Sequence, residues 1–205
     1  TVRQDEWISF EPVSGSPETG IIFYPGGLLD ARGYSEMLKA IAREGYLVVL
    51  ATMPFDLAVL SPNRAREVIE AYPGIEKWVI GGHSLGGAMA AQFAAENGDR
   101  LEGLLFFDAY PPESIDLRDF AGLVGWIHRA DEAGKMPGYY ERHLARMPSD
   151  VRRYPIVGGT HINFGRFIPA ERFRSPAPPV LPVEAQMESV ASAATDFLEK
   201  LSGRN

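Results

Sequence analysis

The sequence predicts a doubly wound α/β domain built on a mostly parallel β-sheet. Short apolar runs alternate with amphipathic segments along the whole chain, a pattern typical of parallel strands joined by helices. No internal repeat and no linker divides the sequence, so residues 1–205 are expected to form a single domain. A chain of 205 residues is long enough to bury a sizeable core.

The first half of the chain contains two predicted strand–helix pairs. The run GIIFYP at 20–25 reads as a buried strand that ends in the turn GGLLD. The segment 34–45 carries apolar residues at helical spacing, and Gly45 suits the end of a helix. A second apolar strand is expected over 46–53. A helix over 61–74 would begin with a serine N-cap followed by proline.

The middle of the chain continues the alternation. KWVIGG at 77–82 predicts a third strand, and LGGAMAAQFAAENG at 85–98 predicts a helix rich in small residues. Two further apolar runs, at 101–110 and 122–128, predict the fourth and fifth strands. A short connection at 111–121 separates them, which leaves no room for a folded cap domain.

Three elements complete the predicted fold. A helix is expected over 139–147, and a weaker strand over 151–158 is placed near a sheet edge because it contains Pro155. A long amphipathic helix is expected over 183–203, with Gly203 at its end.

Composition excludes several classes of function. The formal charge of −7 comes from 20 basic and 27 acidic residues, and no Lys/Arg cluster indicates binding to nucleic acid or to an anionic membrane. The absence of cysteine removes disulfides, thiolate catalysis and cysteine-based zinc sites. No apolar stretch reaches 18 residues, so no membrane-spanning segment is expected in this chain. The oligomeric state and the compartment are not indicated.

The segment GGHSLGG places Ser84 between a predicted strand and a predicted helix. A sharp turn there would project the hydroxyl group towards a substrate, but it would crowd the residues two before and two after the serine. Glycine at both positions, Gly82 and Gly86, relieves that crowding. The start of the following helix also directs N–H groups at the site. Ser84 is therefore the candidate nucleophile, and a structural turn without chemistry is the alternative.

A serine nucleophile needs a general base, and the sequence contains four histidines. His83 is adjacent to the serine, so a packing or loop role is expected for it. His128 falls within an apolar strand, and His143 is expected on a surface helix. His161, in the loop VGGTHINFG after the last strand, can reach over the carboxyl edge of the sheet and is the candidate base.

The base needs an orienting carboxylate. Asp131 follows the fifth strand at its carboxyl end, and the chain order Ser84, Asp131, His161 is the order of the α/β-hydrolase triad. The neighbouring Glu132 is one alternative. Asp108, after the fourth strand in FFDAYPP, is the other.

The oxyanion of an acyl-transfer intermediate needs two backbone N–H groups. Leu85, directly after the nucleophile, is expected to supply one. The turn YPGGLLD supplies the other through Gly27, with Leu28 as the next choice. An ordinary Pro-Gly turn is the alternative interpretation of that segment.

These segments together resemble a known family. YPGGLLD, GYLVVLATMP, WVIGGHSLGGAMAAQFAAE and GGTHINFG are similar to the α/β-hydrolase superfamily, in particular its compact lid-free alpha/beta hydrolase family 5, related to dienelactone hydrolases. The resemblance covers about residues 20–200. It implies an α/β-hydrolase fold without a cap domain and the five site residues chosen above. His128 and Glu132 stand where such relatives usually carry glycines around the acid.

The expected function is a serine esterase. A Ser-His-Asp triad would cleave carboxylic esters of small or accessible acyl substrates through an acyl-enzyme, with no metal or organic cofactor. A loop with Phe164, Phe167 and Phe173 would form one apolar wall. A thioesterase, a lactone hydrolase and a non-catalytic binding domain are the alternatives. Some relatives carry an N-terminal anchor, and a chain that begins at Thr1 is compatible with an extracytoplasmic or tethered location through a segment ahead of it.

Overall fold

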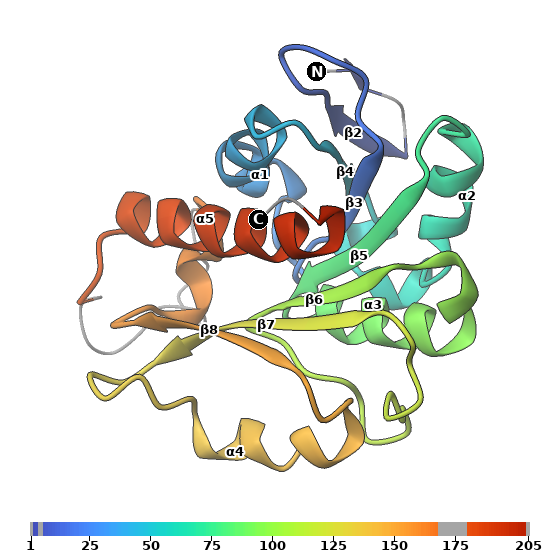
Figure 1. The fold of residues 1–205 in the computed structure, drawn as a ribbon. Coiled ribbons are helices and arrows are strands. Elements are labelled where there is room, and N and C mark those ends of the chain that lie inside the picture. Colours follow the sequence, from blue (N-terminus) through green and yellow to red (C-terminus); the bar gives the residue numbers. More distant parts are fainter. Residues whose placement is uncertain (1, 4–5, 168–179, 204–205) are drawn as a thin grey trace.

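The computed structural model describes residues 2–3, 6–167 and 180–203, and its core is one eight-stranded sheet (Figure 1). The strands are arranged in the order β1-β2-β4-β3-β5-β6-β7-β8. Their bounds are Val2–Arg3 (β1), Trp7–Phe10 (β2), Thr19–Tyr24 (β3), Leu47–Ala51 (β4), Lys77–His83 (β5), Gly103–Phe107 (β6), Leu123–Ala130 (β7) and Arg152–Val157 (β8).

Strands β3 to β8 are parallel, which confirms the predicted sheet. Each of the six predicted strands has a counterpart, and β8 lies at the edge, as Pro155 indicated. Strands β1 and β2, which were not predicted, add an antiparallel margin beside β4. WISF and VR are too short to show a strand period, and β2 depends on pairing with β4, which lies about 40 residues further along the chain.

The helices are α1 (Ser35–Arg43), α2 (Arg64–Ala71), α3 (Leu85–Glu96), α4 (Gly138–Glu141) and α5 (Val183–Ser202). Gly45 and Gly203 follow α1 and α5 with φ of 99° and 67°, the conformation expected of glycine after a helix. The expected helix over 139–147 is split into α4 and a short 3₁₀ turn. Helix α2 begins three residues later than expected, where the Tyr24 hydroxyl accepts the N–H of Ala65.

Helices cover both faces of the sheet, as a doubly wound fold requires. Helices α1 and α5 pack on one face, and α2 and α3 pack on the other (Figure 1). Neighbouring residues of β3 divide between the faces: Ile21 and Phe23 are buried under α1 and α5, whereas Ile22 and Tyr24 are buried under α2 and α3. Because β3 and β5 are covered on both sides, their sequences are nearly continuous apolar runs.

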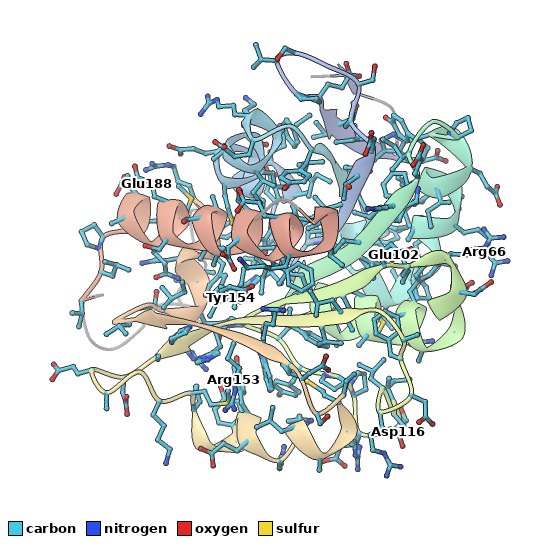
Figure 2. All side chains as sticks on the ribbon, in the orientation of Figure 1. Arg66, Glu102, Asp116, Arg153, Tyr154 and Glu188 are labelled. Atoms are coloured by element: carbon cyan, nitrogen blue, oxygen red, sulfur yellow. The ribbon has the colours of Figure 1, made fainter. Side chains whose placement is uncertain are left out.

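Charged side chains cover the outside of these layers. Figure 2 shows Arg66, Asp116 and Glu188 projecting from the surface, and all three are exposed. At the sheet edge, Tyr154 and Arg153 of β8 point to opposite faces, with the Tyr154 hydroxyl donating to Asp196 of α5 at 3.0 Å. No helix among residues 2–3, 6–167 and 180–203 is long and apolar enough to cross a membrane.

The connection between β6 and β7 contains turns but no helix, and no cap domain is built on it. The carboxyl ends of the central strands are therefore left open, in agreement with the predicted fold class. This open edge is where the chain turns sharply from β5 into α3.

The turn from β5 into α3 is pressed against the end of β3. A Cβ atom on Gly86 would lie 2.2 Å from the carbonyl oxygen of Tyr24 and 2.4 Å from that of Pro25. A Cβ atom on Gly82 would lie 2.7 Å from the Tyr24 oxygen and 2.6 Å from the carbonyl carbon of Gly86. Neither position has space for a side chain, so the two glycines set how closely α3 approaches the sheet.

We predict that Gly86→Ala lowers the free energy of unfolding by about 1–3 kcal/mol or more, because backbone atoms rather than a flexible side chain block the new methyl group. Gly74→Ala is the matched control, since nothing lies within 4 Å of its added Cβ. It should leave the unfolding free energy unchanged or slightly higher. Urea denaturation of the two variants measures the difference, and equal stability would contradict this account of the turn.

Candidate active site

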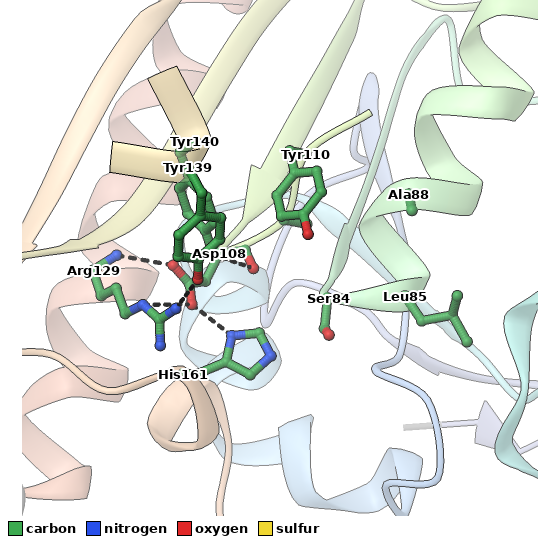
Figure 3. A pocket seen from close by; sticks show the side chains of 10 residues that line it. Ser84, Leu85, Ala88, Asp108, Tyr110, Arg129, Tyr139, Tyr140 and His161 are labelled. Atoms are coloured by element: carbon green, nitrogen blue, oxygen red, sulfur yellow. Dashed lines mark hydrogen bonds and ion pairs between the residues drawn. The ribbon is translucent and has the colours of Figure 1, made fainter. Parts of the chain in front are cut away.

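Ser84 sits at the apex of the β5–α3 turn in a strained conformation, with φ of 53° and ψ of −121°. A non-glycine residue held there costs on the order of 1–3 kcal/mol, and such strain concentrates at functional sites. The N–H of Ser84 donates to the carbonyl of Phe107 at 3.3 Å, which ties the turn to β6. Figure 3 shows the Ser84 hydroxyl projecting from the turn into a pocket at the open edge of the sheet.

His161 reaches the same pocket from the loop after β8, at the start of a short 3₁₀ helix over His161–Phe164. Its position is held from α5. The buried amide of Gln186 accepts the N–H of Thr160 at 2.9 Å and donates to the Thr160 carbonyl at 2.8 Å. Among the described residues no hydrogen bond joins Ser84 Oγ to His161, although one edge of the ring faces the side on which Ser84 lies (Figure 3).

The carboxylate that meets His161 is Asp108, not Asp131. Nδ1 of His161 lies 2.5 Å from Oδ2 of Asp108 (Figure 3). A carboxylate only accepts hydrogen bonds, so Nδ1 carries the proton and Nε2 is left as an acceptor. The expected pairing of His161 with Asp131 is therefore wrong, and the alternative named from the FFDAYPP segment holds that position.

Asp131 lies in the neighbouring turn and is engaged there. Its Oδ1 accepts the backbone N–H groups of Ala133 at 3.0 Å and Lys135 at 2.9 Å. Asp108 follows β6, the strand next to β5, whereas Asp131 follows β7, one strand further from the turn. The two N–H groups hold the Asp131 carboxylate within its own turn, and Asp108 is the carboxylate that reaches His161.

Asp108 is fully buried and held as a carboxylate. Burial alone would raise its pKa, but the hydrogen bond from His161, the charges of His161 and Arg129 and the Arg129 N–H together hold the pKa below its usual value. The backbone N–H of Arg129 donates to Oδ1 at 3.1 Å, and its guanidinium Nε lies 3.6 Å from Oδ2. The hydroxyl of Tyr140 donates to the Asp108 carbonyl at 3.1 Å.

His83 does not line the pocket, and its ring packs against that of His161. It is fully buried, and its ring stacks on Phe164 with the centroids 5.4 Å apart. Nδ1 lies 2.8 Å from the Tyr34 hydroxyl, and Nε2 lies 2.9 Å from the carbonyl of His161. Burial first, and then the charge of His161, hold the pKa of His83 well below its usual value, so its ring is neutral. The packing or loop role expected of His83 is thus a contact with the loop that carries His161.

The two expected oxyanion donors lie beside each other. A Cβ atom on Gly27 would lie 2.8 Å from Cδ2 of Leu85, so the loop after β3 passes close to the start of α3. The alternative donor, Leu28, is already engaged, since its N–H donates to the carbonyl of Asp56 at 2.8 Å. This leaves Gly27 as the better candidate of the two.

Ser84, Asp108 and His161 all line one pocket of about 430 Å³. It is lined by Ser84, Leu85, Ala88, Asp108, Ala109, Tyr110, Arg129, Tyr139, Tyr140 and His161. Its aromatic wall is thus formed by three tyrosines. The expected phenylalanine wall is not part of it: Phe164 is buried beneath His83, Phe167 packs edge-on against Tyr34, and Phe173 lies outside the described residues.

Several residues of this site carried no signal that reasoning from sequence could use. His143 was expected on a surface helix, but it is buried and stacks on Tyr110 with the centroids 4.2 Å apart. Arg129, Tyr139 and Tyr140 come from a strand end and a short helix that only the sheet order brings to Ser84. In the part of the chain that the structure describes, no group of three His, Asp or Glu residues could hold a metal ion.

Comparisons with known proteins agree with the fold. The family model described as the alpha/beta hydrolase family matches residues 20–172. The fold is similar to that of Est1E from Butyrivibrio proteoclasticus with ferulic acid bound, with a TM-score of 0.71 and 12% identity over 96% of this chain and 95% of that one. It is also similar to the thermophilic esterase Est2 from Thermogutta terrifontis, with a TM-score of 0.65 and 15% identity over 95% and 87% of the two chains.

MenH from S. aureus has the same fold, with a TM-score of 0.66 and 11% identity over 97% of this chain and 100% of that one. A search of curated sequences finds no match. Because the family model covers most of the chain, the protein belongs to the alpha/beta hydrolase family. The expected resemblance is confirmed.

The depressed pKa of His83 predicts acid sensitivity. An unfolded chain binds a proton at this residue below about pH 6.5, whereas the folded chain keeps the ring neutral, so stability is lost as the pH falls through that value. The contribution to the slope reaches about 1.4 kcal/mol per pH unit. His83→Gln should remove it, while the depressed His128 and His143 contribute to both proteins. Urea denaturation between pH 5 and 8 measures the slopes, and identical slopes would contradict the buried neutral ring.

Proposed function

We propose that the protein is a serine hydrolase that cleaves carboxylic esters through an acyl-enzyme, with Ser84 as nucleophile, His161 as general base and Asp108 as its orienting acid. The proposal includes a single catalytic domain formed by residues 1–205. The observation that carries it is the 2.5 Å contact between His161 Nδ1 and Asp108 Oδ2 in a pocket shared with a strained serine. Membership of the hydrolase family and the esterases among its structural neighbours support it.

The tautomer of His161 suits this role. With Nδ1–H donated to Asp108, Nε2 is free to take the proton of Ser84 as Oγ bonds to the carbonyl carbon of the ester. The π electrons of the carbonyl move onto its oxygen. As the tetrahedral intermediate collapses, the bond from carbon to the alcohol oxygen breaks and His161 returns the proton to the departing alcohol. Water then repeats both steps on the acyl-serine and releases the acid.

The developing oxyanion is assigned to the N–H groups of Leu85 and Gly27. Leu85 is the first residue of α3, and its N–H belongs to the helix terminus, where no intrahelical acceptor is available. Partial positive charge at that terminus favours the negative oxygen. Gly27 has no side chain to displace a substrate from the neighbouring loop, which supports its assignment as the second donor.

The buried charges around Asp108 support the same chemistry. During the reaction His161 becomes an imidazolium, and an ionised Asp108 beside it stabilises that charge. Arg129 keeps Asp108 ionised through its backbone N–H and its guanidinium group. The open pocket and the missing cap over the β6–β7 connection favour small or accessible acyl groups.

We predict a burst of p-nitrophenol, equal to the enzyme concentration, when the wild-type protein is mixed with p-nitrophenyl acetate. An alkyl fluorophosphonate should label Ser84, because the same activated oxygen attacks phosphorus. Ser84→Ala should abolish both reactions while the domain stays folded. A wild-type protein that neither turns over short esters nor takes the label would instead indicate a non-catalytic binding domain. Thioesters and lactones in the same assay distinguish the related acyl substrates.

We predict that Asp108→Asn lowers kcat by on the order of 10⁴-fold, because an amide presents the wrong hydrogen-bonding group to Nδ1 of His161. Asp131→Asn is the matched control, since it makes the same change at the carboxyl end of the next strand. It should keep kcat close to that of wild type. Steady-state kinetics on p-nitrophenyl acetate compare the variants, and the reverse result would return the role of the acid to Asp131.

A further inference from the structure

We propose that His83 and Tyr34 are positioning residues that join the oxyanion loop to the loop of the catalytic base through one directional chain of hydrogen bonds. The inference rests on the proposed function. Neither side chain lines the pocket, so neither is expected to touch substrate. They connect the loop that carries Gly27 with the loop that carries His161. The reaction needs these two loops in a fixed position relative to each other.

Three distances define this chain of hydrogen bonds. The N–H of Gly26 donates to the Tyr34 hydroxyl at 3.0 Å, that hydroxyl lies 2.8 Å from Nδ1 of His83, and Nε2 of His83 lies 2.9 Å from the carbonyl oxygen of His161. Gly26 directly precedes Gly27, the proposed oxyanion donor. This chain of hydrogen bonds therefore begins beside the proposed oxyanion donor and ends on the backbone of the proposed base.

The direction of every proton follows from the end groups. The carbonyl of His161 can only accept, so Nε2 of His83 must carry a proton. In a neutral imidazole Nδ1 is then an acceptor, and the Tyr34 hydroxyl must donate to it. The lone pairs of that hydroxyl are left to accept the N–H of Gly26. One tautomer of His83 therefore satisfies all four groups. In a protonated His83, Nδ1 would also carry a proton, so the Tyr34 hydroxyl could no longer donate to it.

The surroundings hold this arrangement rigidly. His83 and Tyr34 are both fully buried, so water is not available to replace a lost bond. The His83 ring packs against the rings of Phe164 and His161, with centroid separations of 5.4 and 4.5 Å. A Cβ atom on Gly26 would lie 2.8 Å from both Nδ1 of His83 and the Tyr34 hydroxyl. The loop approaches this closely because residue 26 has no side chain.

The expected consequence is an effect on the chemical step. Displacements of about 1 Å at a reacting group can cost on the order of 100-fold in rate, and His161 and Gly27 both depend on this chain for their placement. Substrate binding in the open pocket does not involve His83 or Tyr34. Loss of these hydrogen bonds should therefore lower kcat and the rate of fluorophosphonate labelling, with little change in KM.

The test uses two tyrosines whose hydroxyls each accept a backbone N–H and donate one hydrogen bond. Tyr24 is also fully buried, and its hydroxyl donates to the Pro62 carbonyl at 2.8 Å and accepts the N–H of Ala65 at 2.7 Å. Tyr34→Phe and Tyr24→Phe therefore remove the same group from opposite faces of the sheet. Both should lower the midpoint of thermal unfolding, but only Tyr34→Phe should lower kcat on p-nitrophenyl acetate, by about 10- to 100-fold.

Substitutions of His83 separate the hydrogen bonds from the ring. His83→Phe keeps a ring against Phe164 but removes both bonds, whereas His83→Gln keeps an acceptor and a donor on one side chain. We expect kcat to fall furthest in His83→Phe and to be partly restored in His83→Gln. Equal kcat in Tyr34→Phe and Tyr24→Phe, or equal losses in the two His83 variants, would overturn the proposal.

A second measurement does not depend on activity. Long-range ¹H–¹⁵N spectra of the labelled protein report which nitrogen of His83 carries the proton, with the signal assigned by its loss in His83→Gln. The Nε2–H tautomer is expected, and an Nδ1–H tautomer would overturn the proposal. A wild-type protein with the expected tautomer but no turnover and no labelling of Ser84 would overturn the proposed function instead.

Discussion

The close packing of the β5–α3 turn against the end of β3 is the constraint on which the rest of the site depends. The backbone of Gly86 lies against the carbonyls of Tyr24 and Pro25, with no space for a side chain between them. This contact bends the chain sharply enough to hold Ser84 at a positive φ. It also brings the loop that follows β3 to the first turn of α3. The same contact thus exposes the candidate nucleophile and sets two candidate oxyanion donors beside it.

A second constraint follows from burying a carboxylate near this turn. Asp108 has no exposed side-chain surface, and an unpaired charge there would cost several kcal/mol. His161, the backbone N–H of Arg129 and the Arg129 guanidinium group compensate the charge. The base loop is therefore attached to the sheet through Asp108. It is also attached to α5 through Gln186 and to β5 through His83, so three elements restrict the position of one imidazole.

The fold was largely predictable because its signals are local. Apolar runs marked the six parallel strands, and glycines marked the ends of α1 and α5. The strand–GGHSLGG–helix pattern identified the turn at Ser84 because the steric requirement falls on adjacent residues, Gly82 and Gly86. Strands β1 and β2 were not predicted because they are two and four residues long, and β2 pairs with β4, which is distant in the sequence.

The sequence by itself determined the fold class, the strained serine and a histidine in the last loop, since each follows from composition or spacing within a few residues. Only the tertiary structure decided between Asp108 and Asp131. Both follow a strand at its carboxyl end, and their sequence contexts are equivalent in that respect. The carboxylate of Asp131 accepts the N–H groups of Ala133 and Lys135 in its own turn, whereas the buried carboxylate of Asp108 lies 2.5 Å from Nδ1 of His161. A hydrogen bond reaches only about 3 Å, so the folded positions of loops that lie far apart in the sequence select the partner of His161.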